Sequence, residues 1–131
     1  MGYCMEQRDS FFVIKKEKQE EAYDYVFDIL IENLPKYGYS FVDDTELNSA
    51  KTLVDIFQSF SWRPTINKNG DIGNIYFEGE KAGDESWLFC TVAPFVEDGS
   101  YIEMMGENGD LWRWIFKDGE CNEVSPTIKW E

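Results

Sequence analysis

The sequence contains no histidine, and this absence excludes more chemistry than any other feature of its composition. Without an imidazole there is no Ser-His or Cys-His nucleophile pair, no histidine general base and no histidine-ligated zinc site. Cysteine is scarce as well: Cys4, Cys90 and Cys121 are widely spaced and form no CxxC pair. That usage is typical of free thiols in a reducing compartment.

Long apolar runs are also missing. No stretch approaches the roughly 20 apolar residues that a membrane-spanning helix needs. The first residues do not follow the basic-then-apolar order of a secretion signal. We therefore expect a cytoplasmic protein that does not bind a membrane.

Basic residues are few relative to acidic ones. The 12 lysines and arginines stand against 26 aspartates and glutamates, which gives a formal net charge of −14. Such a charge disfavours direct binding to nucleic acid, because phosphate backbones repel it. Two interpretations stay open: the charge keeps the surface solvated and the protein soluble, or it attracts a partner protein with a basic surface.

What the sequence does contain is enough apolar material for one domain spanning residues 1–131, since 43% of the chain is hydrophobic and 17% is aromatic. Residues 11–15 (FFVIK) predict the first strand. Apolar residues at helical spacing predict a helix over residues 16–35, which Pro35 and Gly38 end. The inward side of this helix consists of Ala22, Val26, Ile29, Leu30 and Asn33.

A second helix is predicted over about residues 49–60, where apolar side chains again recur at helical spacing. Asn48 is its expected N-cap, and Pro64 prevents its continuation. Residues 67–71 (NKNGD) then predict a turn, and residues 72–77 predict a strand.

Residues 86–96 (SWLFCTVAPFV) fit two structures. Their β-branched and aromatic content favours a strand. The alternative is a short helix that Asp84 caps and Pro94 ends, with its apolar side chains turned inward: Leu88, Phe89 and Val92. Propensity alone does not decide between the two.

The C-terminal third has three turn signals, at Asp98-Gly99, Asn108-Gly109 and Asp118-Gly119, spaced ten residues apart. This spacing is typical of an antiparallel meander. The complete pattern predicts an α+β fold: a single antiparallel sheet with a C-terminal three-stranded meander, and two or three helices packed on one face.

Trp112 and Trp114 lie two residues apart in one predicted strand and therefore share a face. We expect both to be core residues, because the sheet must offer an apolar face to the helices. Arg113 then lies on the opposite face, where a cross-strand ion pair with Glu103 is its expected contact. Binding of a ligand at this tryptophan pair is the alternative.

The face without helices is the candidate interaction face. Alternation leaves Leu111 and Ile115 partly exposed there beside charged and aromatic neighbours. The residues that we select for this face and its turn are Tyr101, Glu103, Glu107, Asp110 and Arg113.

Several short motifs lack part of the chemistry that a functional site would need. Residues 65–76 partly mimic a calcium loop, but Tyr76 stands where a bidentate glutamate belongs, so we expect no metal site. The adjacent carboxylates Asp43-Asp44 and Asp84-Glu85 are typical of solvated turns or helix caps. Residues 8–10 (Arg-Asp-Ser) predict a turn before the first strand, with Arg8 in a surface ion pair.

Three segments carry a resemblance: GYCMEQRDSFFVIKKE, FEGEKAGDESWLF and APFVEDGSYIEMMGENGDLWRWIFKDG. They resemble a family of small proteins from Gram-positive gut bacteria, their phages and their mobile elements. The resemblance implies a short helix at residues 85–93 and an accessory role, and it supplies no catalytic residue.

These observations predict a non-catalytic acidic interaction protein of phage or mobile-element origin, a candidate inhibitor of a host or defence protein. It is not expected to be an enzyme or to need a cofactor, because no phosphate loop, nucleophile elbow or dinucleotide fingerprint is present. The alternative function is a small-ligand binding module that uses the open sheet face. A carboxylate-based hydrolase is the least favoured of the three.

Overall fold

The computed structural model of the 131-residue chain describes residues 2–33, 39 and 42–130. Its elements, in chain order, are β1 (Met5–Phe11), α1 (Lys16–Glu32), α2 (Asp44–Asn48), α3 (Leu53–Ser59), β2 (Trp62–Ile66), β3 (Ile72–Phe77), α4 (Glu85–Val92), a 3-10 turn (Ala93–Phe95), β4 (Tyr101–Gly106), β5 (Leu111–Lys117) and β6 (Glu120–Val124). Among the described residues, none of the helices is both long and apolar enough to cross a membrane.

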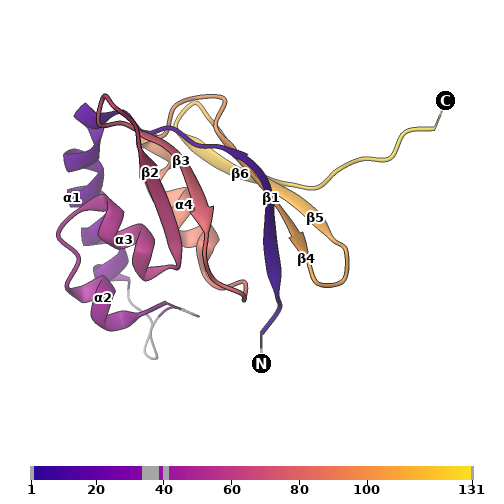
Figure 1. Cartoon of the computed structure of the whole chain (residues 1–131), viewed down its shortest axis with the longest axis horizontal. Coiled ribbons are helices and arrows are strands. Elements are labelled where there is room, and N and C mark those ends of the chain that lie inside the picture. The colour runs from indigo at the N-terminus through magenta and orange to yellow at the C-terminus, as the bar shows by residue number, and fades with distance from the viewer. Residues whose placement is uncertain (1, 34–38, 40–41, 131) are drawn as a thin grey trace.

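The fold is α+β, and its strands form two antiparallel sheets. A four-stranded sheet has the order β1-β4-β5-β6, and β2 pairs with β3 in a separate hairpin. In Figure 1, α1, α2 and α3 lie on one side of the molecule, the four-stranded sheet on the other, and the hairpin and α4 between them. The expectation of a single sheet was wrong, because β1 and β3 meet through backbone pairs only near their ends.

The first strand was misplaced by the sequence. It was predicted at residues 11–15, but β1 covers Met5–Phe11 and pairs with β4. The apolar run contains Phe12 and Ile14, which are fully buried beyond the end of the strand. Ile14 exchanges two backbone hydrogen bonds with Ile72 (3.0 and 2.9 Å), so the run crosses the core as a buried connection to α1.

The first helix follows its predicted pattern in part: Ile29 is only half-buried and Asn33 is exposed at the C-cap, whereas Ala22, Val26 and Leu30 are buried. Their spacing of four residues places them on one stripe of the helix, which faces the core. The proposed stop signals Pro35 and Gly38 lie outside the described residues.

The helix predicted over residues 49–60 corresponds to α3, which begins only at Leu53; the short helix α2 before it was not predicted, so the described part of the chain has four helices where two or three were expected. Asn48 ends α2 and is not an N-cap. Thr52 caps α3, because its hydroxyl accepts from the Asp55 N–H while the Asp55 carboxylate accepts from the Thr52 N–H. Pro64 lies inside β2 and does not stop a helix.

Of the two structures open to residues 86–96, the segment adopts the helix. It forms α4, with Asp84 at the N-cap position, and a 3-10 turn containing Pro94 follows. Leu88, Phe89 and Val92 are fully buried, as the helical alternative requires.

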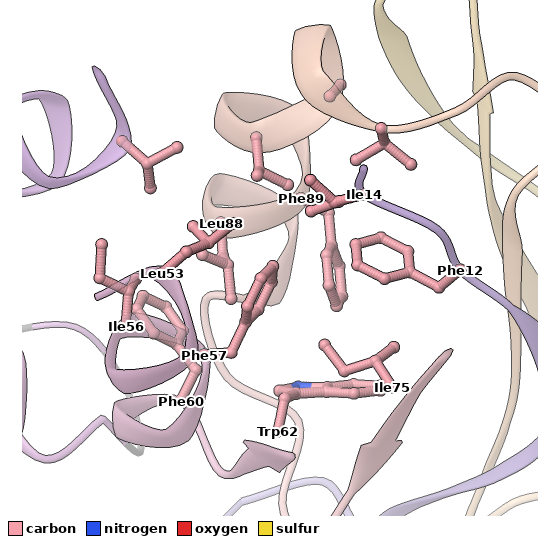
Figure 2. Close-up of a cluster of buried hydrophobic side chains, with 14 of the residues drawn as sticks. Phe12, Ile14, Leu53, Ile56, Phe57, Phe60, Trp62, Ile75, Leu88 and Phe89 are labelled. Atoms are coloured by element: carbon pink, nitrogen blue, oxygen red, sulfur yellow. The ribbon is translucent and has the colours of Figure 1, made fainter. Parts of the chain in front are cut away.

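The core joins both sheets to the helices through aromatic side chains. Figure 2 shows Trp62 and Ile75 of the hairpin facing Phe12, Phe57 and Phe89. Trp62 and Phe89 have ring centroids 5.2 Å apart, and Phe12 and Phe57 5.8 Å. Such edge-to-face pairs add to the free energy gained by burying their area.

The two tryptophans of β5 differ in burial. Trp114 is 4% exposed and lies in the core, with its ring centroid 4.9 Å from that of Phe89. Trp112 is half-buried and packs edge-on against Trp114 at 6.1 Å. The prediction that both are core residues is therefore correct for Trp114 and only half correct for Trp112.

Candidate functional site

The four-stranded sheet has one face turned to the core and one turned to solvent, which we call the open face. Ile102, Met104, Trp114 and Phe116 are buried on the core face. The register of the four strands then places these residues on the open face: Glu6, Arg8, Asp9, Phe11, Tyr101, Glu103, Met105, Leu111, Arg113, Ile115, Asn122 and Val124. All of them are partly or fully exposed.

Glu103 is the centre of the open face, because its carboxylate contacts two arginines. Arg113, directly opposite on β5, donates to Glu103 Oε1 through Nη2 at 2.7 Å and Nε at 2.8 Å. Arg8 of β1 lies 3.5 Å from Oε2. The predicted cross-strand pair is confirmed, and the structure adds a second cation that the sequence did not reveal.

Tyr101 and Asp9 extend this contact into a network. The Arg113 guanidinium lies 4.8 Å from the centroid of the Tyr101 ring, a cation–π distance. The Tyr101 hydroxyl donates to Asp9 Oδ2 at 2.7 Å, and this hydrogen bond raises the pKa of Tyr101 above its usual range, with burial and the Asp9 charge adding to the rise. We call Asp9, Tyr101, Arg113, Glu103 and Arg8 the central network.

Arg8, Asp9 and Phe11 are site residues that the sequence analysis missed. The turn predicted at residues 8–10 lies inside β1, whose register with β4 shifts between Gln7 and Asp9. Such a bulge interrupts strict alternation, which explains why the neighbouring residues Arg8 and Asp9 both reach the open face, Arg8 contacting Glu103 and Asp9 contacting Tyr101. The expected ion pair of Arg8 is confirmed with Glu103 as its partner.

Glu107 and Asp110 lie at the rim, in the turn between β4 and β5. The turn is tied to the N-terminal segment: the Cys4 N–H donates to Glu107 Oε1 at 3.1 Å, and the Glu107 N–H donates to the Cys4 carbonyl at 2.9 Å. The Tyr3 hydroxyl contacts Asn108 and lies 3.4 Å from Asp110 Oδ2. Three of the five predicted residues thus meet in the central network, and these two flank it as exposed acids.

A cleft of about 480 Å³ opens between β1 and β3, beside the central network. Here the side chain of Gln7 on β1 bonds to the backbone of β3. Its Nε2 donates to the Ile75 carbonyl at 2.8 Å, and its Oε1 accepts from the Phe77 N–H at 2.7 Å. Arg8 and Asp9 also line the cleft. It is a polar groove that continues the open face toward β3.

A second hollow, of about 340 Å³, lies where β6 stops pairing with β5. The last pair of this ladder is Arg113 with Val124, so the edge of β5 at Leu111 and Trp112 faces residues 125–127. The half-buried Trp112 ring therefore borders both the core and this hollow.

The acids singled out in the sequence mostly support the backbone. Residues 65–76 form the β2–β3 hairpin, and the Asp71 carboxylate accepts from the Lys16 N–H at 2.7 Å, at the start of α1. Asp43 accepts from the Glu46 N–H and caps α2. Within the described ranges, no group of three or more Asp, Glu or Cys side chains could hold a metal ion.

Glu85 is the most deeply buried of these acids, at 4% exposure against 8% for Asp71. Burial raises its pKa above the ordinary value of 4.5, and the hydrogen bond that its Oε1 accepts from the Gly83 N–H opposes the rise only in part. The nearby Trp62 indole N–H also opposes it, although this N–H forms no hydrogen bond of normal geometry with a described residue. The position of Glu85 at the start of α4 makes it a structural group.

Comparison of the chain with protein-family models, with curated proteins and with solved structures gives no match.

Proposed function

We propose that the protein is a non-catalytic interaction protein, and that its open face binds a partner protein with a basic surface. The observation that carries this proposal is the central network, which holds charged and aromatic side chains in place on a sheet face that faces solvent. An inhibitor of phage or mobile-element origin, acting on a host or defence protein, is the biological role that we assign to this surface.

The central network supports binding because its side chains are already ordered. Arg113 is fixed by two hydrogen bonds to Glu103 and by the Tyr101 ring, and Tyr101 is fixed by Asp9. Side chains that hold one rotamer before association lose less entropy on binding. Tyrosine and arginine are also enriched among the residues that dominate binding free energy.

Apolar side chains surround this network and supply area to bury. Phe11 is 49% exposed and Val124 is 38% exposed, although both are large and apolar. Met105, Leu111 and Ile115 are half-buried between them. A partner that covered these side chains would gain hydrophobic contact around a polar centre.

The charge that attracts a basic partner lies outside the network. Within it, Arg8 and Arg113 balance Asp9 and Glu103, so its formal charge is zero. About half of the excess lies on the rim and along α1, whose exposed acids are Glu17, Glu20, Glu21, Asp24, Asp28 and Glu32. No ion pair joins any of these six to another described residue. Unpaired acids of this kind accelerate association with a basic surface.

A matched pair of triple variants tests where the partner binds. The rim variant Glu6→Gln, Glu107→Gln, Asp110→Asn and the helix variant Glu20→Gln, Asp24→Asn, Asp28→Asn each remove three exposed carboxylates. Partners retained from host lysate are identified, purified and measured against both variants and the wild type at graded salt.

We expect the rim variant to lose at least about tenfold in affinity, which corresponds to ~1.4 kcal/mol, and the helix variant to lose much less. Nucleic acid should compete with the protein for the partner, because both would cover the same basic surface. Equal losses in the two variants would contradict contact through the open face. Direct binding of duplex DNA to the protein itself would contradict the proposal as a whole.

The hollow beside Trp112 favours a second candidate function, the binding of a small ligand. Its volume of about 340 Å³ falls at the lower end of the range of ligand pockets. Trp112 and Arg113 are among its lining residues, and because both side chains end in planar groups, a planar ligand is the class that fits. A small-molecule screen read by thermal shift tests this candidate, and hits that Trp112→Phe and Arg113→Lys do not weaken would exclude the hollow.

A further inference from the structure

Two of the three cysteines, far apart in the sequence, meet where α4 packs beside β6. Cys90 lies on α4 and is exposed, and Cys121 lies on β6 and is half-buried. The Cys90 thiol donates to the Cys121 carbonyl oxygen, with Sγ and O 3.8 Å apart. Burial is the main cause that raises the pKa of the Cys121 thiol, and the neighbouring Cys90 thiol adds to the rise.

A second contact shows that the helix and the strand run in register here. Ser86, one helical turn before Cys90, donates from Oγ to Glu123 Oε1 at 3.3 Å, and Glu123 lies two residues after Cys121. Four residues of an α-helix rise about 6 Å. Two residues of a strand rise about 6.8 Å. Because these rises nearly match, the Ser86–Glu123 and Cys90–Cys121 contacts form two successive rungs between α4 and β6.

The neighbours of the two rungs hold them in place. Cys121 pairs with Phe116 of β5, which is buried, so its side chain lies on the core face of the sheet. The Trp114 indole N–H donates to Ser86 Oγ at 3.3 Å and ties the first rung to the core. The thiol of Cys90 therefore meets a fixed partner while remaining accessible from solvent.

We propose that Cys90 and Cys121 are a redox-responsive pair that closes into an intramolecular disulfide and locks the edge strand β6 onto α4. With glutathione disulfide as oxidant, the exposed Cys90 thiolate attacks one glutathione sulfur, and the other glutathione leaves as a thiolate that takes up a proton. Cys121 then loses its proton and attacks the Cys90 sulfur of this mixed disulfide, which expels the second glutathione. Two protein thiols are oxidised, and one glutathione disulfide is reduced to two glutathione thiols.

Closure should stabilise the fold, because β6 is an edge strand held by β5 on one side and by α4 beneath it. A disulfide from Cys90 to Cys121 closes a loop of about 30 residues, which restricts the unfolded chain; the expected rise in melting temperature is about 5–10 °C. The third thiol, Cys4, takes no part, because it lies at the other end of the sheet, where its backbone pairs with Glu107 after β4 and its sulfur contacts the Lys81 ammonium at 2.9 Å.

The experiment uses the full chain, first fully reduced and then incubated with glutathione disulfide. Intact mass spectrometry should show the loss of two hydrogens, peptide mapping without reductant should join the Cys90 and Cys121 peptides, and the melting temperature should rise. The matched control Cys4→Ser should behave as the wild type does. Cys121→Ser should stop at the mixed disulfide and keep one glutathione on Cys90.

Other outcomes would overturn the proposal. These are a disulfide that includes Cys4, covalent dimers in place of the internal bond, or wild-type protein that retains glutathione on Cys90 without closing. An internal Cys90–Cys121 bond that lowers the melting temperature would overturn the lock on β6. Because the wild-type chain alone decides these points, the result does not depend on whether a cysteine variant folds.

Discussion

Replacing Trp114 by alanine should destabilise the fold by about 3–5 kcal/mol, the cost of a large aromatic truncation in a core. The side chain is 4% exposed and has aromatic rings on three sides, with centroids at 4.9 Å for Phe89, 6.1 Å for Trp112 and 6.2 Å for Trp62. The substitution also removes the hydrogen bond from its indole N–H to Ser86. None of these neighbours can fill the space, because each is held by its own strand or helix.

Trp112→Ala is the matched comparison, since the same residue type two positions away is only half-buried. Because half of its surface already contacts solvent, we expect a cost of about 1–2 kcal/mol. Urea unfolding followed by circular dichroism measures both variants, and the slope with denaturant should stay unchanged.

Fluorescence gives an independent measurement on the same tryptophan. The chain has five tryptophans, and two of them, Trp87 and Trp130, are 48% and 89% exposed. Trp114→Phe should therefore remove emission that is shifted to short wavelength and resists acrylamide quenching. The assignment of Trp114 to the core would be refuted if Trp112→Ala cost as much as Trp114→Ala, or if the lost emission were freely quenched.

Three further predictions concern other parts of the molecule. Glu85→Gln should stabilise the protein at neutral pH. Burial raises the pKa of Glu85 in the folded state above the ordinary value of 4.5, so the wild type loses stability as the pH rises from 4.5 through the raised pKa. The glutamine variant does not lose this stability, because its side chain does not ionise. Melting temperatures from pH 4 to 8 measure this, and parallel curves would contradict it. Thr52→Ala should cost about 1 kcal/mol by removing the cap of α3, whereas Thr45→Ala, an exposed site without a cap role, should cost little in the same urea assay. Excess chelator, or added calcium or zinc, should leave the melting temperature unchanged, and a shift of several degrees at near-stoichiometric metal would overturn the expectation that no metal is needed.

Elements whose residues interact with near neighbours could be predicted from the sequence. The stripe of α1 repeats every four residues, so its buried face follows from spacing alone. Gly99, Gly109 and Gly119 all adopt positive φ (91°, 88° and 77°), a conformation that glycine enters without steric cost. The turn at Gly109 joins β4 to β5 and sets their register, which predicted the Glu103–Arg113 pair.

The second helix shows how local signals can mislead. The apolar spacing predicts a helix that begins at residue 49, but Thr52 and Asp55 form a capping box that starts α3 only at Leu53, after a break that separates it from α2. The periodicity of apolar residues indicates which side chains face the core. It does not indicate at which residue a helix begins or ends. The capping sequence was present and could have located the break.

Only the tertiary structure decided the N-terminal half of the site. The strand β1 contributes polar side chains to the open face, and its register with β4 shifts between Gln7 and Asp9. It therefore lacks the regular alternation of apolar and polar residues that identifies a strand. Its pairing partners in β4 lie 90 to 101 residues away in the chain, and no local rule connects the two strands. The contact between Glu103 and Arg8 arises in the same way, and so does the contact between Cys90 and Cys121. Each joins two residues that are far apart in the sequence and that tertiary packing brings together.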